Sequence, residues 1–204
     1  MNEADIARLA IEGRETRSVE LKASMPWADL GTKAKVLKAV AALANTADGG
    51  LLLFGLTESD PPGTHALTGV PEAVSAGFAT DDVASFVNSH VYPSVSLDVR
   101  HVVVEGLQVV GIAVRQFTDI PVMITKALDI PGEKGSAVKL GAIYVRGLKL
   151  NATCELSAPD DLRELVRLAS LRELERYFQV RALERDAGPG DTAKFLAQLK
   201  GWES

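Results

Sequence analysis

Hydrophobic and polar positions follow two different periods in the first quarter of the chain. Residues 18–24, SVELKAS, alternate between apolar and polar side chains, which predicts a strand with one buried face. Residues 31–50, GTKAKVLKAVAALANTADGG, place apolar side chains on one face at helical spacing and end in Asn45 and a glycine pair, as helix C-termini do. Residues 51–56, LLLFGL, form an unbroken apolar run, which indicates a strand covered on both faces.

The rest of the chain continues in elements of similar length. They are expected to be a short N-terminal helix ending at Gly13, a loop at 57–69, a helix at 80–91, two strands within 96–117, a loop at 118–136, a strand at 137–147 and a helix starting at Ser157. Glu105-Gly106 separates the two strands and predicts a hairpin. This order of elements predicts an α/β fold, with a mixed sheet flanked by helices and a C-terminal helical extension.

The C-terminal helix has two apolar faces. Leu162 and Leu165 belong to one stripe, whereas Leu171, Leu174 and Phe178 lie on roughly the opposite face at helical spacing. Either the helix kinks near Ser170, or its second half contacts something other than its own domain. We favour a partner subunit and divide the chain into a domain at 1–168 and a helical extension at 169–204 that contains a dimer contact.

Composition limits the possible functions. The net charge of −5 and a pI near 5.3 argue against a general DNA coater, so any nucleic-acid site must be a local basic patch. A single cysteine, Cys154, allows neither an intramolecular disulfide nor a thiolate zinc cluster, and we interpret it as a packed apolar side chain. The N-terminus has acids where a signal peptide needs basic residues, and no apolar run is long enough to cross a membrane. We therefore expect a cytoplasmic protein without a membrane partner.

Several common catalytic motifs are missing from the sequence. It contains no GxxxxGK[ST] loop, no GxGxxG after a strand, no GxSxG and no HExxH. These absences disfavour an NTPase, a serine hydrolase and a zinc peptidase.

Carboxylates offer a more specific possibility. Glu15 and Glu20 bracket the first strand, and Glu58 and Asp60 follow the strand at 51–56. If the two strands are neighbours, three acids can converge at one edge of the sheet, where oxygen ligands bind Mg²⁺ or Mn²⁺ and activate water against a phosphodiester. The alternative is that these acids are solvated side chains at strand ends.

Basic residues surround these carboxylates. Between Gly13 and Ala39 there are six basic side chains and three acids, and Arg146 and Lys149 follow the last strand. The candidates for contact with phosphate are Arg17, Lys22, Lys35, Lys38, Arg146 and Lys149. A solvated basic face is the alternative interpretation. Aromatic residues for base stacking are scarce, and Trp27 and Tyr144 are the candidates.

Taken in order, these segments resemble the AlbA_2 domain of Schlafen proteins. The resemblance rests on E-x4-E-L-K at Glu15–Lys22, KAVAALANTADGGLLLFGLTES, Pro93, GIAVRQFTDIP and YVRG at 144–147, and covers roughly residues 10–168. It implies an α/β nucleic-acid-binding lobe. Bacterial members are described as DNA-binding or as divergent, AAA-4-like ATP-binding proteins.

The resemblance also implies a catalytic site and an assembly. In Schlafen members that cleave tRNA and rRNA, three acids form a metal-dependent ribonuclease site. Glu15 and Glu20 match the first two, and Glu58 falls where the family usually has aspartate, with Asp60 as its competitor. Schlafen cores place two such lobes side by side, so a single lobe implies a homodimer.

Three functions follow as hypotheses. The first is a Mg²⁺- or Mn²⁺-dependent endoribonuclease on structured RNA such as tRNA. The second is a non-catalytic DNA- or RNA-binding module in transcription or phage defence. The third is a nucleotide-binding regulatory domain that uses the turn at 45–50.

Overall fold

The computed structural model of the chain describes residues 2–132, 134–148 and 151–186, the last six of these by their backbone alone. The chain forms two compact units, Met1–Leu165 and Val166–Ser204. The first unit contains every strand described and is the subject of this section. The described helices include none that is long and apolar enough to cross a membrane.

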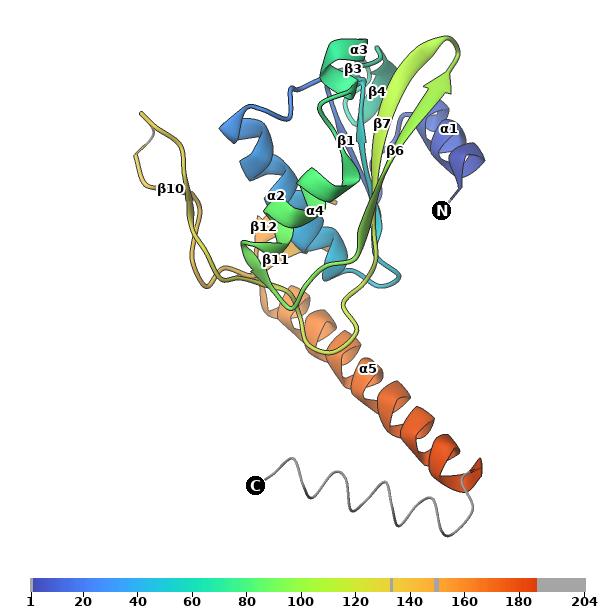
Figure 1. Ribbon diagram of the computed structural model, residues 1–204, viewed down its shortest axis with the longest axis vertical. Coiled ribbons are helices and arrows are strands. Elements are labelled where there is room, and N and C mark those ends of the chain that lie inside the picture. The colour runs from blue at the N-terminus through green and yellow to red at the C-terminus, as the bar shows by residue number, and fades with distance from the viewer. Residues whose placement is uncertain (1, 133, 149–150, 187–204) are drawn as a thin grey trace. The chain divides into compact units, whose positions relative to one another are not determined.

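A mixed four-stranded sheet forms the centre of the first unit (Figure 1), in the order β1-β2-β7-β6. The strands are β1 (Val19–Lys22), β2 (Gly50–Phe54), β6 (Leu97–Val104) and β7 (Leu107–Val114). β1 runs parallel to β2, whereas β2–β7 and β7–β6 are antiparallel. The predicted mixed α/β fold is therefore confirmed, and β1 lies at one edge of the sheet.

Helix α2 (Leu30–Ala44) makes the crossover that a parallel strand pair requires. Its N-terminus is capped by the Asp29 carboxylate, which accepts from the backbone N–H of Thr32, and its C-cap is Asn45. Burial over most of its length anchors it to the sheet. Gly49 then returns the chain with φ of 75°, where an added Cβ would lie 2.1 Å from the Val114 carbonyl oxygen. The predicted helix end is confirmed.

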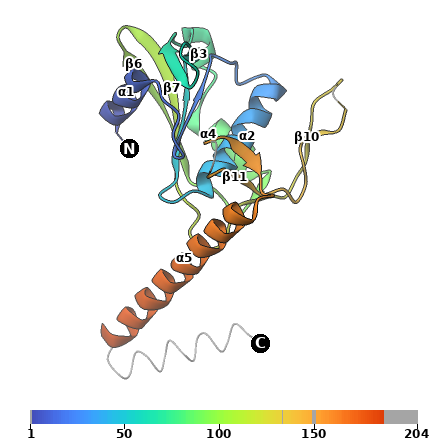
Figure 2. The same ribbon diagram turned by 180° about the vertical axis from the view of Figure 1, so that it is seen from behind.

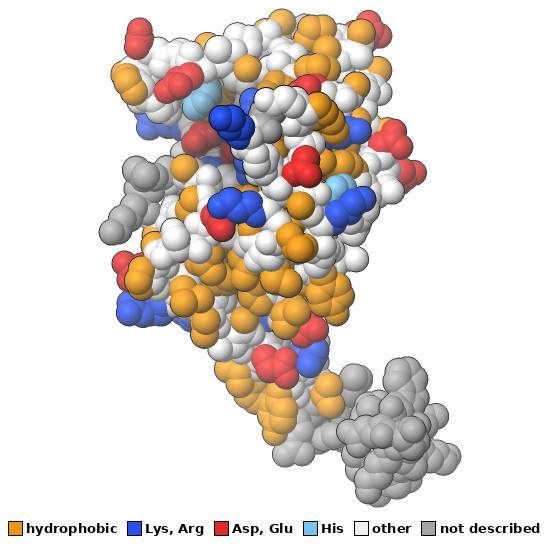
Figure 3. Space-filling view, turned by 90° about the vertical axis from the view of Figure 1, so that its left-hand side faces the viewer, with side chains coloured by type: hydrophobic (Ala, Val, Ile, Leu, Met, Phe, Trp, Pro, Cys, Tyr) orange, Lys and Arg blue, Asp and Glu red, His pale blue; other side chains and the backbone are white. Residues whose placement is uncertain are grey.

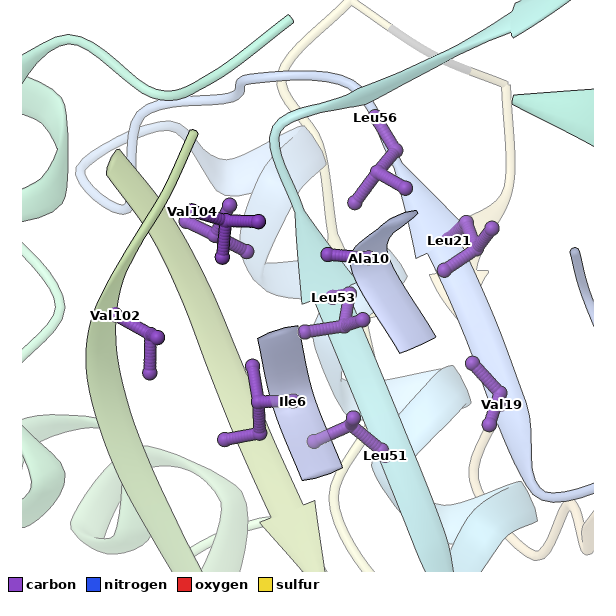
Figure 4. Close-up of a cluster of buried hydrophobic side chains, with 10 residues drawn as sticks. Ile6, Ala10, Val19, Leu21, Leu51, Leu53, Leu56, Val102 and Val104 are labelled. Carbon is purple, nitrogen blue, oxygen red and sulfur yellow. The ribbon is translucent and has the colours of Figure 1, made fainter. Parts of the chain in front are cut away.

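Helix α1 (Glu3–Glu12) covers one face of the sheet. It begins with a capping box between Asn2 and Asp5 and ends at Gly13 in the left-handed conformation. Figure 4 shows its apolar side chains against those of β1, β2 and β6. This cluster comprises Ile6, Ala10, Val19, Leu21, Leu51, Leu53, Leu56, Val102, Val104 and Val109.

Helices α2 and α4 (Thr80–Asn88) lie on the opposite face of the sheet (Figures 1 and 2). An aromatic cluster fills the space beside them, in which the ring centroids are 5.0 Å apart for Phe54 and Phe78, 5.7 Å for Phe78 and Trp27, and 5.5 Å for Trp27 and Phe86. The sheet is thus covered on both sides, which explains the continuous apolar run of β2.

Two predictions between 51 and 69 are wrong. The run 51–56 breaks at Gly55, whose φ is 103°, so β2 ends there and β3 (Leu56–Ser59) begins. The expected loop at 57–69 is instead a hairpin of β3 with β4 (Thr64–Leu67). Pro and Gly in this stretch form the tip of the hairpin, where they are compatible with strands on either side.

The remaining elements are short except for the last helix. They are α3 (Glu72–Ser75), the pair β5 (Val91–Tyr92) and β8 (Met123–Ile124), the pair β9 (Leu128–Asp129) and β10 (Ser136–Val138), the pair β11 (Tyr144–Arg146) and β12 (Thr153–Glu155), and α5 (Pro159–Asp186). The predicted strand at 137–147 is divided between β10 and β11. The hairpin at Glu105-Gly106 is confirmed, with both residues at positive φ. Helix α5 continues through Ser170 without interruption.

Candidate functional site: an ion-pair cluster at the edge of β1

A buried guanidinium lies at the centre of the candidate site. The Arg146 side chain, on β11, is 1% exposed. One of its terminal nitrogens donates to Glu20 Oε2 at 2.7 Å, and the other donates to the carbonyl oxygens of Thr16 at 2.9 Å and Val19 at 3.3 Å. Its Nε–H is buried without a hydrogen-bond partner in the described part of the chain. Arg146 is therefore part of the interior and does not offer its charge to a phosphate at the surface.

The Glu20 carboxylate is the main partner of this guanidinium. Glu20 is 4% exposed, although it lies on an edge strand. Its Oε2 also accepts from the Thr153 hydroxyl at 2.6 Å, and its Oε1 pairs with Lys22 Nζ at 2.7 Å. Both carboxylate oxygens are thus occupied by cationic or hydroxyl donors.

The Glu15 carboxylate contacts both β1 and the Arg146 guanidinium. Its Oε1 accepts from the backbone N–H of Leu21 at 2.9 Å, and its Oε2 is 4.0 Å from Arg146. The sequence prediction that Glu15 and Glu20 approach each other is supported, because one guanidinium lies within ion-pair distance of both carboxylates.

One hairpin and the sheet bring these residues together. The β11–β12 pair places Arg146 directly opposite Thr153, and both side chains then reach Glu20 on β1. β11 also packs against α2, which fixes the hairpin beside the sheet. Sequence reasoning missed Thr153 and assigned Arg146 to the surface. The available signal was the position of Arg146 in a strand, where a charged side chain between apolar neighbours indicates a buried partner.

Glu58 and Asp60 occupy a different hairpin. Glu58 lies on β3 opposite His65 on β4 and is exposed, and Asp60 lies in the turn between the two strands. No hydrogen bond or ion pair of the described residues joins either acid to Glu15 or Glu20. Within the described ranges there is also no group of three His, Cys, Asp or Glu side chains that could hold a metal ion.

The residues around Glu20 fit a divalent cation poorly. Arg146 and Lys22 already place two positive charges on its carboxylate, at 2.7 Å each. A metal ion bound to the same oxygens would lie within a few ångströms of both cations, in a site where burial reduces the screening of their repulsion. The protein's own cations, Arg146 and Lys22, therefore already neutralise the Glu20 carboxylate.

The predicted phosphate contacts are divided between paired and unpaired side chains. Arg17 is partly exposed, donates to the Arg146 carbonyl oxygen and lies 3.5 Å from Glu164. Lys22 is 29% exposed and bound to Glu20. Lys35 is exposed and Lys38 is partly exposed, both on α2. Lys149 lies outside the described residues.

Helix α2 is the most clearly cationic element. It contains Lys33, Lys35 and Lys38 and no acidic residue after the Asp29 cap. The ammonium of Lys33 lies 5.3 Å from the ring centroids of both Trp27 and Phe86, and Lys35 contacts Met25. Among the residues described, none of the three lysines forms an ion pair. On the face that Figure 3 shows, basic and acidic side chains are interspersed.

The aromatic candidates for base stacking are packed in the core. Trp27 is 7% exposed and stacks within the aromatic cluster, and Tyr144 is 6% exposed. Burial raises the pKa of the Tyr144 hydroxyl, which stays neutral. Neither ring presents a face to a base.

Neither the Cys154 thiol nor the recess beside the turn at 45–50 has the properties of a catalytic or phosphate-binding site. Cys154 is exposed, so the interpretation as a packed side chain is wrong, although partial desolvation raises the pKa of its thiol and disfavours the reactive thiolate. A recess of about 360 Å³ adjoins the turn at 45–50 and is lined by Asp48, Asp98, Arg100 and Arg115 among others. Its two arginines are matched by two aspartates, so its charge does not select for a phosphate.

Comparisons with known proteins show which family the chain belongs to and which solved structures it is similar to. The model of the Schlafen AlbA_2 family matches residues 15–152, which include the charged residues Glu15, Glu20, Lys22 and Arg146 but not Thr153. No curated protein matches the chain. Among solved structures it is similar to the DIP2311 protein from Corynebacterium diphtheriae, with 16% identity and a TM-score of 0.48 over 79% of this chain and 27% of that one. It is also similar to the N-terminal domain of a RecG-related protein from Nitrosomonas europaea, with 24% identity and a TM-score of 0.45 over 67% of this chain and 88% of that one. Because the family model covers well over half of its 204 residues, the chain belongs to the Schlafen AlbA_2 family.

Proposed function

We propose that this protein is a non-catalytic nucleic-acid-binding module that holds phosphates on the outer face of α2. The observation that carries the proposal is the charge of this helix, which has three lysines and no acid. Lys35 and Lys38 are one turn apart, and their ammonium groups form no ion pair with a described acid. Cations without an ion-pair partner are available to phosphate oxygens. Arg17 and Lys22 add weaker contacts, because each already faces a carboxylate.

The net charge of −5 limits the strength of this binding. Each phosphate neutralised by a lysine releases about one condensed counterion, so the number of contacts sets the salt dependence of the affinity. Two to four contacts give a shallow slope, with log Kd changing by roughly 0.7–0.9 per contact for each tenfold change in salt. We expect binding that is weak at physiological salt and stronger below it.

Fluorescence anisotropy with labelled tRNA and with duplex DNA tests the proposal. The substitution K35A/K38A should weaken binding and reduce the salt slope by about two contacts. The matched control is R100A/R115A, which also removes two positive charges. Arg100 and Arg115 are each two residues from a side chain that packs on the α1 face, Val102 and Ala113 respectively, so they lie on the opposite side of the sheet from α2. Equal effects of the two double variants would contradict the proposal.

A metal-dependent endoribonuclease is the competing function. It is favoured by the approach of Glu15 and Glu20 to each other and opposed by the cations that neutralise them. Incubating tRNA with Mn²⁺ or Mg²⁺ distinguishes the two functions. Cleavage by the natural protein that is lost in E15Q/E20Q would replace the binding module with the enzyme, whereas intact tRNA that still binds supports the module.

The proposed module acts as a homodimer. Leu171, Leu174 and Phe178 are between 43% and 65% exposed on the described part of α5, and their apolar surface gains from burial against a second copy. A dimer carries twice as many α2 lysines as one lobe, and two lobes that bind the same nucleic acid together bind it more tightly than one.

A further inference from the structure

The free edge of β1 is closed by side chains. In a sheet, an edge strand leaves alternate backbone N–H and C=O groups without a neighbouring strand, and such an edge is a template for pairing with another chain. β1 bonds inward to β2, where the Leu51 N–H donates to the Ser18 carbonyl at 2.8 Å and the Gly55 N–H donates to the Lys22 carbonyl at 2.9 Å. Its outward groups have to find other partners.

The acids and the arginine of the cluster supply those partners. The outward N–H of Leu21 donates to Glu15 Oε1 at 2.9 Å, and the outward carbonyl of Val19 accepts from Arg146 at 3.3 Å. The Val19 carbonyl also accepts from the Thr16 N–H at 3.0 Å, so the segment before β1 folds back on the same edge. Arg146 in turn bonds to the Thr16 carbonyl, which ties this segment to β11.

Charge balance supports the same interpretation. Glu15 and Glu20 carry two negative charges, and Arg146 and Lys22 carry two positive ones within 4.0 Å. A neutral group of this kind satisfies its members without an external ion, whereas a cluster of acids alone would need one. The Thr153 hydroxyl donates to the remaining acceptor position on Glu20.

We infer that Glu15, Glu20 and Arg146 form an ion-pair clamp that closes the outer edge of β1, and that the two glutamates do not ligate a divalent cation. In this assignment Glu15 is a cap for a backbone N–H, and Glu20 is the counter-charge that holds Arg146 in place. The clamp goes beyond nucleic-acid binding and does not depend on it.

Amide hydrogen exchange of the full chain tests the capping role. In E15A the Leu21 amide should exchange about tenfold faster or more, because it loses a hydrogen bond to a charged acceptor. In E15Q it should stay within about threefold of the natural protein, since the amide oxygen of glutamine accepts the same bond. The Leu51 amide, which bonds to Ser18, is the internal control and should not change in either variant. Unchanged exchange of Leu21 in E15A would overturn the inference.

Thermal unfolding of the natural protein and of E15Q/E20Q, each with and without Mn²⁺, tests the second half of the inference. The clamp predicts that saturating Mn²⁺ changes the unfolding midpoints of the natural protein and of E15Q/E20Q equally, because these two glutamates do not bind the ion in the folded state. A Mn²⁺-dependent rise in midpoint that is lost in E15Q/E20Q would show ligation by these carboxylates and refute the clamp. Neither measurement contains nucleic acid, so failure of the clamp and failure of the α2 binding surface are separate results.

Discussion

Replacing Arg146 with methionine should remove a large part of the stability of the first unit. Methionine keeps much of the unbranched side chain but removes every donor of the guanidinium. Glu20 would then keep a buried negative charge without its closest buried partner, and the carbonyls of Thr16 and Val19 would lose a donor. Breaking one side of a buried ion pair costs about 3–5 kcal/mol. Because a domain of this kind is stable by about 5–15 kcal/mol, the loss is a substantial fraction of the total.

Urea unfolding followed by circular dichroism measures this loss. With an unfolding slope of roughly 2–3 kcal/mol per molar urea, R146M should lower the midpoint by about 1–2.5 M. The double variant E20Q/R146M should recover part of the loss, by about 1–3 kcal/mol, because it removes the unpaired carboxylate as well.

Arg100 provides the matched control. It also pairs with a carboxylate at 2.7 Å, that of Asp98, but the two side chains are 40% and 49% exposed. An exposed pair contributes about 0–1 kcal/mol, so R100M should shift the midpoint only slightly. If R146M and R100M lower the midpoint by the same amount, burial does not strengthen the Arg146 network and the reasoning above is refuted.

Three further predictions follow from other parts of the chain. Asn45 is buried and makes three hydrogen bonds to two backbone segments, so N45A should cost about 2–4 kcal/mol in urea unfolding; a loss below ~1 kcal/mol would contradict this. The hydrogen bond from the backbone N–H of Thr32 lowers the pKa of the Asp29 carboxyl, so the stabilisation by this cap is present at neutral pH and is lost as the pH falls through the pKa of the folded state. The variant D29A should therefore lose less stability on acidification than the natural protein. Equal losses in the two proteins would show that the cap does not cause the loss of stability in acid. L174E should convert a dimer into a monomer by light scattering, and a natural protein that is already monomeric at tens of micromolar would rule out the homodimer.

The main elements of the fold were predictable because their signals are local. Alternation at 18–24 and helical spacing at 31–44 reflect which side chains face the core, and the Glu105-Gly106 pair specifies a two-residue turn. The hairpin at 57–69 was missed because Pro and Gly mark its tip, while its strands pair mainly with each other and are too exposed to show strong alternation.

The candidate site was predictable only in part. The sequence indicated that Glu15 and Glu20 bracket one short strand, and the resemblance to the family pointed to both of them. It did not indicate the partner, since Arg146 and Thr153 are more than 120 residues further along the chain and approach β1 only through the packing of β11 on α2. The prediction that Glu58 joins Glu15 and Glu20 assumed that the strand at 51–56 carries Glu58 to the edge of the sheet beside β1. Instead the strand breaks at Gly55, and Glu58 lies on β3, which pairs with β4 in a separate hairpin.

By itself, the amino-acid sequence determined the class of fold, the Schlafen AlbA_2 membership and the two glutamates that belong together, because periodicity and motif spacing are properties of neighbouring residues. Only the tertiary structure decided what those glutamates do. A carboxylate at a sheet edge binds whichever cation the fold brings to it, and here that cation is the buried guanidinium of Arg146 at 2.7 Å from Glu20.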